Sequence, residues 1–211
     1  MSLLYFLAGM VLRPFLGLFA RLQPIGLENI PDEQGFVIVS NHVGWIDPLW
    51  IGLALWPRAV SPMAKKELFA RWPLRFVLTR LGAFPVTRGA ASPSEIRRPL
   101  DILQNHGVVL IFPGGTREAQ LSGVKRGAAT IAVTAGVPLV PIYFSGPGHL
   151  RLRDVFRRRI ASVVVGDPIH IAGSAEASRE QRKEAILDTV QLIEDRLRHL
   201  GDKFTEEHLA A

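Results

Sequence analysis

The chain has 211 residues, of which 48% are hydrophobic and 21% charged, and these proportions exclude a disordered chain and leave room for one α/β domain with a sizeable core. The formal net charge of +6 favours anionic partners such as nucleic acid, phospholipid headgroups or phosphorylated substrates. The absence of cysteine excludes disulfides, thiolate metal sites and a cysteine nucleophile, and it leaves the redox compartment open.

The N-terminal segment is strongly apolar but short. Its longest uncharged run, residues 2–12, is about half of the ~20 residues that a bilayer-spanning helix needs, and Arg13 and Pro14 then interrupt it. It also lacks the basic start and the cleavage site of a signal peptide. Its aromatic and arginine residues are typical of a helix lying in the membrane interface. We therefore expect residues 1–24 to form an interfacial membrane helix and residues 25–211 to form the folded domain. The alternative is a terminal helix that packs on the domain core.

Beyond the N-terminal segment, strand-like runs alternate with helix-like segments. The strand-like runs are Phe36–Ser40, Ala59–Ala64, Ala83–Thr87, Val108–Phe112, Leu139–Phe144 and Ala161–Val165. The helix-like segments are Pro48–Trp56, Lys66–Leu81, Pro93–Asn105, Lys125–Ala135 and Glu176–Leu200, followed by a tail that we expect to be frayed, Asp202–Ala211. This alternation predicts an α/β fold with a mixed, partly parallel sheet flanked by helices. In such sheets ligands bind beyond the carboxyl ends of the strands, so the residues after each strand are the candidates for a site.

The segment after the first strand-like run contains a histidine and an aspartate. Residues 40–48 read Ser-Asn-His-Val-Gly-Trp-Ile-Asp-Pro, and Asp47 followed by Pro48 is typical of a helix start. Side chains five positions apart on a straight helix point about 140° apart, so a turn through Gly44 is needed to bring His42 to Asp47. A carboxylate that orients an imidazole is the arrangement of a general base. The alternative is that Asp47 only caps the helix and that His42 is an ordinary loop residue.

Two further strand ends carry residues suited to binding anions. Residues 112–118 read Phe-Pro-Gly-Gly-Thr-Arg-Glu, in which two glycines permit close approach of the backbone to a ligand. Thr116 and Arg117 offer a hydroxyl and a guanidinium, and Thr87 and Arg88 repeat this pairing after another strand. Residues 112–118 are not a Walker A loop, because the Gly-Lys-Ser/Thr ending is missing. Taken alone, each segment also fits an ordinary turn with a surface arginine.

Taken together, these segments resemble the glycerolipid acyltransferase family typified by bacterial 1-acyl-glycerol-3-phosphate acyltransferases. The first family motif, Asn-His-x-x-x-x-Asp, is intact as Asn41, His42 and Asp47. The second, an arginine after a short strand, matches Arg88. The third, Phe-Pro-Glu-Gly-Thr-Arg-Ser, matches residues 112–118 with a glycine in place of the glutamate and a glutamate in place of the serine. The fourth, a hydrophobic strand with proline, matches Val137–Ile142, so the similarity runs from about Gly26 to Phe144.

The resemblance implies direct acyl transfer without a metal or a cofactor. The donor would be acyl-CoA or acyl carrier protein, and the acceptor a hydroxyl of a lysoglycerophospholipid, above all 1-acyl-glycerol-3-phosphate, in phospholipid synthesis. His42 would act as the base and Asp47 would orient it. The residues that the resemblance places at the substrate are Asn41, Thr87, Arg88, Gly114, Gly115, Thr116, Arg117 and Glu118.

The glycine at position 114 leaves the acceptor open, because members that use a phosphorylated acceptor have a glutamate there. A neutral or amino-lipid acceptor is the alternative, and Glu118 is a candidate to supply the missing carboxylate. A phospholipid-binding homologue without activity and a lipid esterase that uses water remain alternatives. A nucleic-acid partner is not expected, because no aromatic-basic strand motif or recognition helix is found.

Membrane phospholipids are the expected partners of a chain with a lipid acceptor and an arginine-rich surface. The resemblance places the chain on the membrane, at the cytoplasmic face of the bacterial inner membrane. Arg151–Arg159 (RLRDVFRRR) is a candidate for headgroup contact, and the alternative for this segment is a solvated loop.

Overall fold

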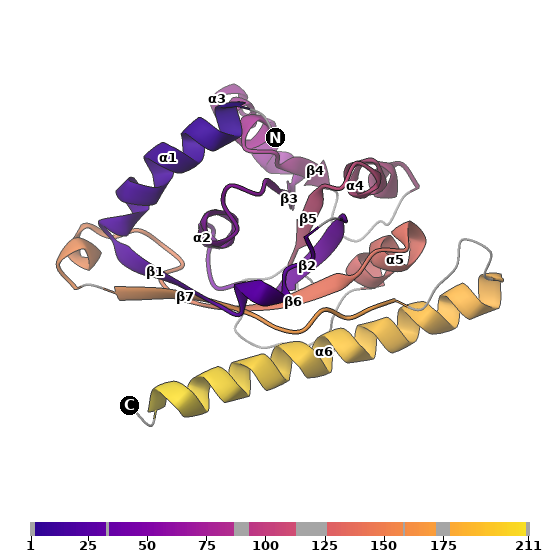
Figure 1. Ribbon diagram of the computed structural model, residues 1–211. Coiled ribbons are helices and arrows are strands. Elements are labelled where there is room, and N and C mark those ends of the chain that lie inside the picture. The colour runs from indigo at the N-terminus through magenta and orange to yellow at the C-terminus, as the bar shows by residue number, and fades with distance from the viewer. Residues whose placement is uncertain are drawn as a thin grey trace.

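The computed structural model describes residues 3–32, 34–86, 93–112, 126–157, 159–171 and 178–209. The described strands form one seven-stranded sheet in the order β1-β7-β6-β2-β5-β3-β4 (Figure 1). Their bounds are β1 Ala20–Ile25, β2 Phe36–Ser40, β3 Val60–Lys65, β4 Phe84–Val86, β5 Val108–Ile111, β6 Leu139–Ser145 and β7 Arg159–Val165. The α-helices are α1 Leu3–Gly17, α2 Asp47–Ala54, α3 Trp72–Arg80, α4 Pro93–Gln104, α5 Arg126–Ala135 and α6 Arg179–Leu209. The described residues also form the short 3₁₀ helices η1 Leu27–Asn29, η2 Lys66–Phe69 and η3 Leu152–Phe156.

The sheet is mixed and mostly parallel, which confirms the predicted fold class. β2 lies at its centre and pairs in parallel with β5 and β6, and β3 pairs in parallel with β5 and β4. β7 runs antiparallel to β6 and parallel to β1. The carboxyl ends of β2, β3, β4, β5 and β6 therefore lie along the same edge of the sheet.

The central strands are mostly apolar because helices cover both faces of the sheet. Phe36 and Ile38 of β2 belong to one buried cluster with residues of α1 and α2, whereas Val37 and Val39 belong to a second cluster with residues of α4, α5 and α6. All four side chains are fully buried, and each such burial stabilises the fold by roughly 1.5–3 kcal/mol. The predicted strand Phe36–Ser40 agrees with β2 at both ends.

β1 is a strand that the sequence analysis assigned to the N-terminal helix. The helix ends at Gly17, and Ala20–Ile25 then pair with β7 from Arg159 to Val164. The burial of β1 alternates over its first four residues, with Ala20 buried and Arg21 exposed. This period of two is the signal of a half-buried strand, and the proline of β1 is tolerated because the strand lies at the sheet edge.

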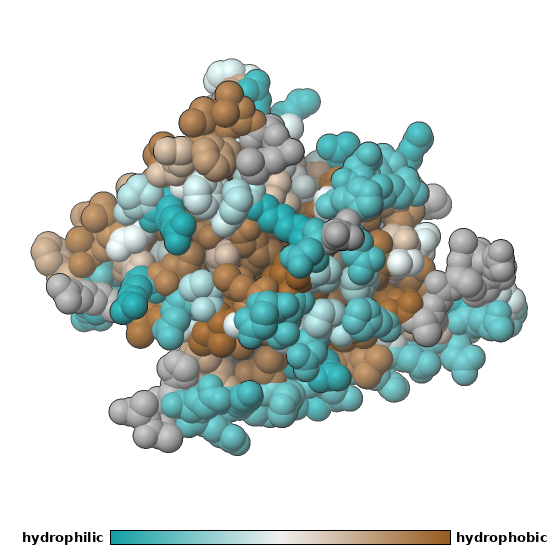
Figure 2. Space-filling model, in the orientation of Figure 1, coloured by the Kyte–Doolittle hydropathy of each residue, from teal (hydrophilic) through white to brown (hydrophobic). Residues whose placement is uncertain are grey.

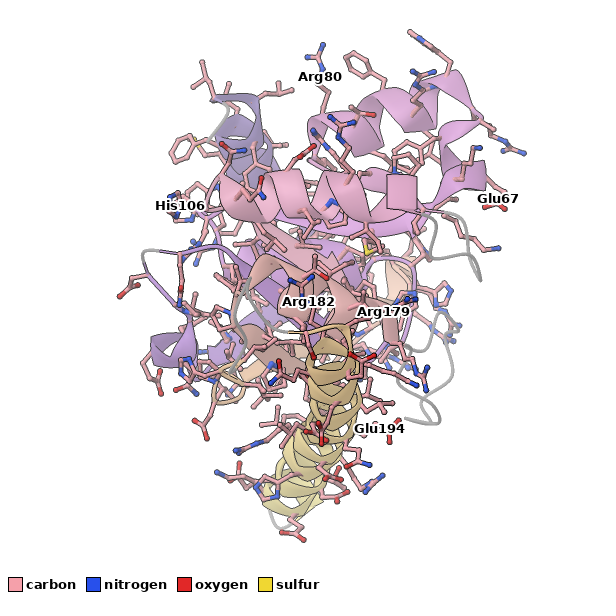
Figure 3. All side chains as sticks on the ribbon, turned by 90° about the vertical axis from the view of Figure 1, so that its right-hand side faces the viewer. Glu67, Arg80, His106, Arg179, Arg182 and Glu194 are labelled. Carbon is pink, nitrogen blue, oxygen red and sulfur yellow. The ribbon has the colours of Figure 1, made fainter. Side chains whose placement is uncertain are left out.

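The last helix is longer than expected, and the expected fraying from Asp202 is wrong for the described residues up to Leu209. Gly201 is buried against the ring of Tyr143, and Phe204 lies 5.6 Å from the same ring, between ring centroids. These contacts hold the end of α6 on β6. Figure 1 shows α6 crossing the whole sheet, and Figure 3 shows it nearly end-on, with Arg179, Arg182 and Glu194 along its length.

The N-terminal helix is present and packs on the domain through one face. The ring of Phe6 stacks on Trp56 at 5.1 Å, and Gly9 lies so close to the same indole that a Cβ atom there would meet it at 2.2 Å. The opposite face carries exposed apolar side chains, which are Leu3, Leu4, Leu7, Met10, Val11 and Phe15. Within the described ranges, no helix is both long and apolar enough to span a bilayer.

Candidate active site

The candidate site lies at the edge where the parallel strands end. β2 ends at Ser40, and His42 follows two residues later. β5 ends at Ile111, and Phe112 is the next residue. The rings of His42 and Phe112 are in contact, with centroids 4.3 Å apart. The loop after the central strand and the start of the Phe-Pro-Gly-Gly segment therefore meet, as expected for strands that are neighbours in a parallel sheet.

Asp47 stabilises the turn through Gly44 that brings His42 close to it. One carboxylate oxygen, Oδ2, lies 2.8 Å from His42 Nδ1 and accepts hydrogen bonds from the amides of Val43 at 2.6 Å and Gly44 at 2.8 Å. The Asp47 side chain is fully buried, and that of His42 is 15% exposed. Because Asp47 opens α2, the positive end of the helix dipole also favours its negative charge.

The helix-capping alternative for Asp47 does not describe this geometry. α2 begins at Asp47 with a proline in its first turn, as expected, but the residue at the cap position is Ile46 and no side chain caps the helix. The carboxylate points to the preceding loop, not to the amides of the first turn. This orientation joins Asp47 to His42 across five positions of sequence.

The contact with Asp47 also selects the tautomer of the His42 imidazole. A carboxylate can only accept hydrogen bonds, so His42 Nδ1 must carry the proton that lies between the two side chains. In the neutral ring, Nε2 is then the nitrogen with a lone pair. No described residue forms a hydrogen bond with Nε2. A His42 that acts as a base would therefore accept the proton at Nε2.

Gly44 is required by close packing of two backbones. A Cβ atom on Gly44 would lie 2.1 Å from the carbonyl oxygen of Gly148 and 2.3 Å from its Cα, and a Cβ on Gly148 would lie 2.9 Å from the Cα of Gly44. The loop that carries His42 is thus pressed against the loop that follows β6. Gly148 was not singled out in the sequence, although the Gly-Pro-Gly run after a strand marks a turn there.

Asn41 ties the end of β2 to β6. Its side-chain nitrogen donates to the carbonyl of Phe144 at 2.8 Å, and its side-chain oxygen accepts from the amide of Phe144 at 2.7 Å. The backbone pairing between β2 and β6 stops at Ser40, so the amide of Asn41 continues the ladder while the main chain turns toward His42. This contact gives Asn41 a structural role, and its direct contact with substrate remains a prediction.

The remaining predicted site residues, Thr87, Arg88, Gly114, Gly115, Thr116, Arg117 and Glu118, lie outside the described residues. Their expected contact with substrate remains a prediction. Within the described part of the chain, no group of three or more His, Asp or Glu side chains is placed to hold a metal ion.

Comparison with known proteins defines the class of molecule that carries this site. A family model described as Acyltransferase matches residues 21–145, which include the whole loop from Asn41 to Asp47. The chain is 33% identical over 195 residues to a 1-acyl-sn-glycerol-3-phosphate acyltransferase of Bacillus subtilis, with 92% of this chain and 96% of that protein covered. It is 30% identical over 183 residues to an enzyme of the same name from Streptococcus pneumoniae, with 86% and 66% covered.

The fold has a counterpart among solved structures. The crystal structure of the 1-acyl-sn-glycerophosphate (LPA) acyltransferase PlsC from Thermotoga maritima superposes with a TM-score of 0.60 at 24% identity, covering 92% of this chain and 78% of that chain. The chain belongs to the Acyltransferase family. The expectations of the glycerolipid acyltransferase family and of an O-acyltransferase enzyme are thereby confirmed.

Proposed function

We propose that the chain transfers a fatty acyl group from acyl-CoA or acyl carrier protein to the free hydroxyl of 1-acyl-glycerol-3-phosphate, as a step of phospholipid synthesis. The observation that carries the proposal is the contact of His42 Nδ1 with the buried Asp47 carboxylate at 2.8 Å. That contact leaves Nε2 to accept a proton. The names of the Bacillus subtilis and Streptococcus pneumoniae relatives support the choice of acceptor.

The reaction needs one base and no covalent acyl-enzyme. His42 Nε2 takes the proton of the acceptor hydroxyl as its oxygen attacks the thioester carbonyl. The C–S bond then breaks, and the imidazolium returns the proton to the leaving thiolate, which yields the ester and the free thiol. The Asp47 carboxylate, 2.8 Å from Nδ1, stabilises the imidazolium while it exists.

We assign the acceptor phosphate to Arg88, Arg117 and the backbone of residues 114–116, and Thr87 and Glu118 to other parts of the substrate. The guanidiniums of Arg88 and Arg117 suit a phosphate because they donate two parallel hydrogen bonds. β5 ends one residue before Phe112, whose ring contacts His42, and residues 113–118 follow Phe112 directly in the chain. This chain order supports the placement of the phosphate close to His42.

A lipid substrate also requires access to a bilayer, and we assign that role to α1. The helix presents exposed apolar side chains on the face away from the domain, including Leu3 at 74% and Val11 at 68% exposure. A helix of 15 residues with this apolar face fits the interfacial region of a membrane. The proposed location is the cytoplasmic face of the bacterial inner membrane.

The experiment is an assay of purified protein with labelled acyl-CoA or acyl carrier protein and a panel of acceptors. The panel holds 1-acyl-glycerol-3-phosphate, a neutral monoacylglycerol, an amino-lipid acceptor and no acceptor. Phosphatidic acid as the main product supports the proposal. Preferred acylation of a neutral or amino-lipid acceptor would show that Gly114 marks a different specificity. Release of fatty acid at the same rate without an acceptor would show an esterase, and no reaction with any donor would leave a binding protein.

A further inference from the structure

The two most exposed large apolar side chains of the described residues lie in one short turn. They are Phe156 at 87% and Leu152 at 83% exposure, and both belong to η3. In the sequence, this segment stands out only for its arginines. Two large apolar side chains exposed within one short turn make that turn a candidate surface for contact with a partner.

η3 is anchored to the domain, so its apolar side chains are held outward. Asp154, between them in sequence, is buried at 1% exposure and forms an ion pair with Arg159 at 3.6 Å. The amide of Asp154 donates to the carbonyl of Arg151 at 2.8 Å, and the amide of Arg157 donates to the carbonyl of Asp154 at 3.1 Å. The turn is thus fixed on its inner side by a buried carboxylate and closed by its own backbone.

The exposed charges around Leu152 and Phe156 are all positive. Arg151, Arg153 and Arg157 are all exposed, and the acidic residue of this turn, Asp154, faces inward. Arginine beside exposed Phe and Leu is the composition of a segment that enters the interface of an anionic membrane. A protein partner would be expected to present acidic side chains in a fixed pattern, whereas a bilayer of anionic lipids needs only a surface charge.

The position of η3 places it beside the C-terminal end of α1. η3 ends three residues before Arg159, which pairs with Ala20, and α1 ends three residues before Ala20. In Figure 1 the short orange turn of η3 and α3 lie toward opposite ends of α1, along one edge of the molecule. α3 is also rich in exposed apolar side chains, with Trp72 at 77%. Figure 2 shows hydrophobic surface at the upper and left ends of this edge and hydrophilic surface over α6.

We propose that η3 is a second membrane-binding element, which inserts Leu152 and Phe156 into the surface of an anionic phospholipid bilayer while the arginines around them bind headgroups. Together with α1 it sets the orientation of the domain on the bilayer. The inference rests on the proposed lipid acceptor, but it concerns a different part of the molecule from the catalytic loop.

The absence of cysteine allows a direct test in the full chain. A Phe156→Cys variant labelled with an environment-sensitive fluorophore is mixed with vesicles of phosphatidylglycerol and phosphatidylcholine. A Val11→Cys variant reports on α1, and a Leu192→Cys variant on α6 is the matched control, because Leu192 is also an exposed leucine at 45%. We expect the fluorescence of the label at 156 to shift to the blue and to be quenched by lipids carrying a quencher in the acyl chain. The label at 192 should not respond.

A charge variant tests the second half of the proposal. Replacement of Arg151, Arg153 and Arg157 by glutamine should weaken binding to anionic vesicles by about fivefold for each arginine removed. It should leave the rate with detergent-dispersed acceptor unchanged. High salt should weaken the binding of the wild type to anionic vesicles and should change the binding of the triple variant little.

Three outcomes would overturn the inference. One is a label at 156 that stays in water while the label at 11 enters the bilayer, which would leave α1 as the membrane contact and the proposed function intact. Another is binding that is equally strong with vesicles of phosphatidylcholine alone. The third is a fluorescence shift at 156 that grows with protein concentration without lipid, which would make the partner a second copy of the chain. Activity on the acceptor panel, measured in detergent, tests the proposed function separately.

Discussion

At the scale of single residues, Asp47 is the centre of the hydrogen bonds in the loop that carries His42. One oxygen accepts from three N–H groups, and Asp47 Oδ1 has no hydrogen-bond partner among the described residues. In Asp47→Asn the amide oxygen can still accept, but the side chain no longer carries the charge that stabilises an imidazolium, and a buried NH₂ replaces Oδ1. We expect kcat to fall by about 10²–10⁴-fold with little change in the KM for the acceptor.

The control for this variant is Asp195→Asn, which removes an exposed carboxylate of α6. Steady-state kinetics with acyl-CoA and 1-acyl-glycerol-3-phosphate provide the comparison. A kcat for Asp47→Asn equal to that of the wild type would show that the carboxylate is only structural.

Gly44 gives a second prediction at this scale, because its neighbour is backbone that cannot rotate away. Gly44→Ala places a methyl group 2.1 Å from the carbonyl oxygen of Gly148, so the two loops must separate and carry His42 with them. A shift of about 1 Å at a catalytic group costs on the order of 10² in rate, and we expect kcat/KM to fall by that order. Gly17→Ala is the matched control, since a Cβ atom there meets nothing within 4 Å. Wild-type activity of Gly44→Ala would mean that the contact with Gly148 does not position His42.

At the scale of elements, α1 combines a buried face and an exposed one. Tyr5 lies on its buried side and accepts a hydrogen bond from the amide of Val60 at 3.2 Å. Burial raises the pKa of Tyr5 above its ordinary value of 10.0, and the hydrogen bond from Val60 opposes this rise. The helix is therefore docked by a phenol that resists ionisation in the folded state.

The sign of the pH effect follows from this shift. A raised pKa in the folded state means that the unfolded chain loses the proton first as the pH rises, so the contribution of Tyr5 is complete below about pH 10 and declines above it. We expect the free energy of unfolding of the wild type to fall more steeply between about pH 9 and about pH 11 than that of Tyr5→Phe. Urea denaturation at both pH values measures the difference, and equal slopes would contradict it.

The end of α6 supplies another prediction for an element. Phe204→Ala removes a ring that lies 5.6 Å from Tyr143, and such a pair contributes about 0.5–1.5 kcal/mol beyond the area that it buries. We expect the free energy of unfolding to fall by at least about 1 kcal/mol. Lys203→Ala, at an exposed neighbouring position, should change it by less than about 0.5 kcal/mol. If the two variants are equally stable, the end of α6 does not contribute to the fold.

At the scale of the whole molecule, the sequence predicts the central sheet well because its strands are buried on both faces. The runs of residues 36–39 and 108–112 are apolar without interruption, and few other structures explain them. β1 was missed because it is short, carries Pro24 and continues directly from an apolar helix. Its pairing with β7 joins residues that are about 140 positions apart, and local pattern holds no information on such a partner.

The contacts of the site also divide into local ones, which the sequence predicts, and long-range ones, which it does not. The contact of His42 with Asp47 is local, and the glycine between them indicated the turn that makes it possible. The bond between Asn41 and Phe144 and the packing of Gly44 on Gly148 depend on β2 and β6 being neighbours. Those two contacts follow from the order of the strands, which spacing along the chain does not reveal.

The rate of phosphatidic acid formation by His42→Gln tests directly whether His42 is the base of the reaction. Glutamine keeps the size and polarity of the side chain but cannot take a proton from the acceptor hydroxyl. We predict a loss of about 10²–10⁴-fold in kcat relative to the wild type, with full activity in His199→Gln, which changes an exposed histidine of α6. Formation of phosphatidic acid by His42→Gln at the wild-type rate would show that His42 is not the base and that the reaction uses another one.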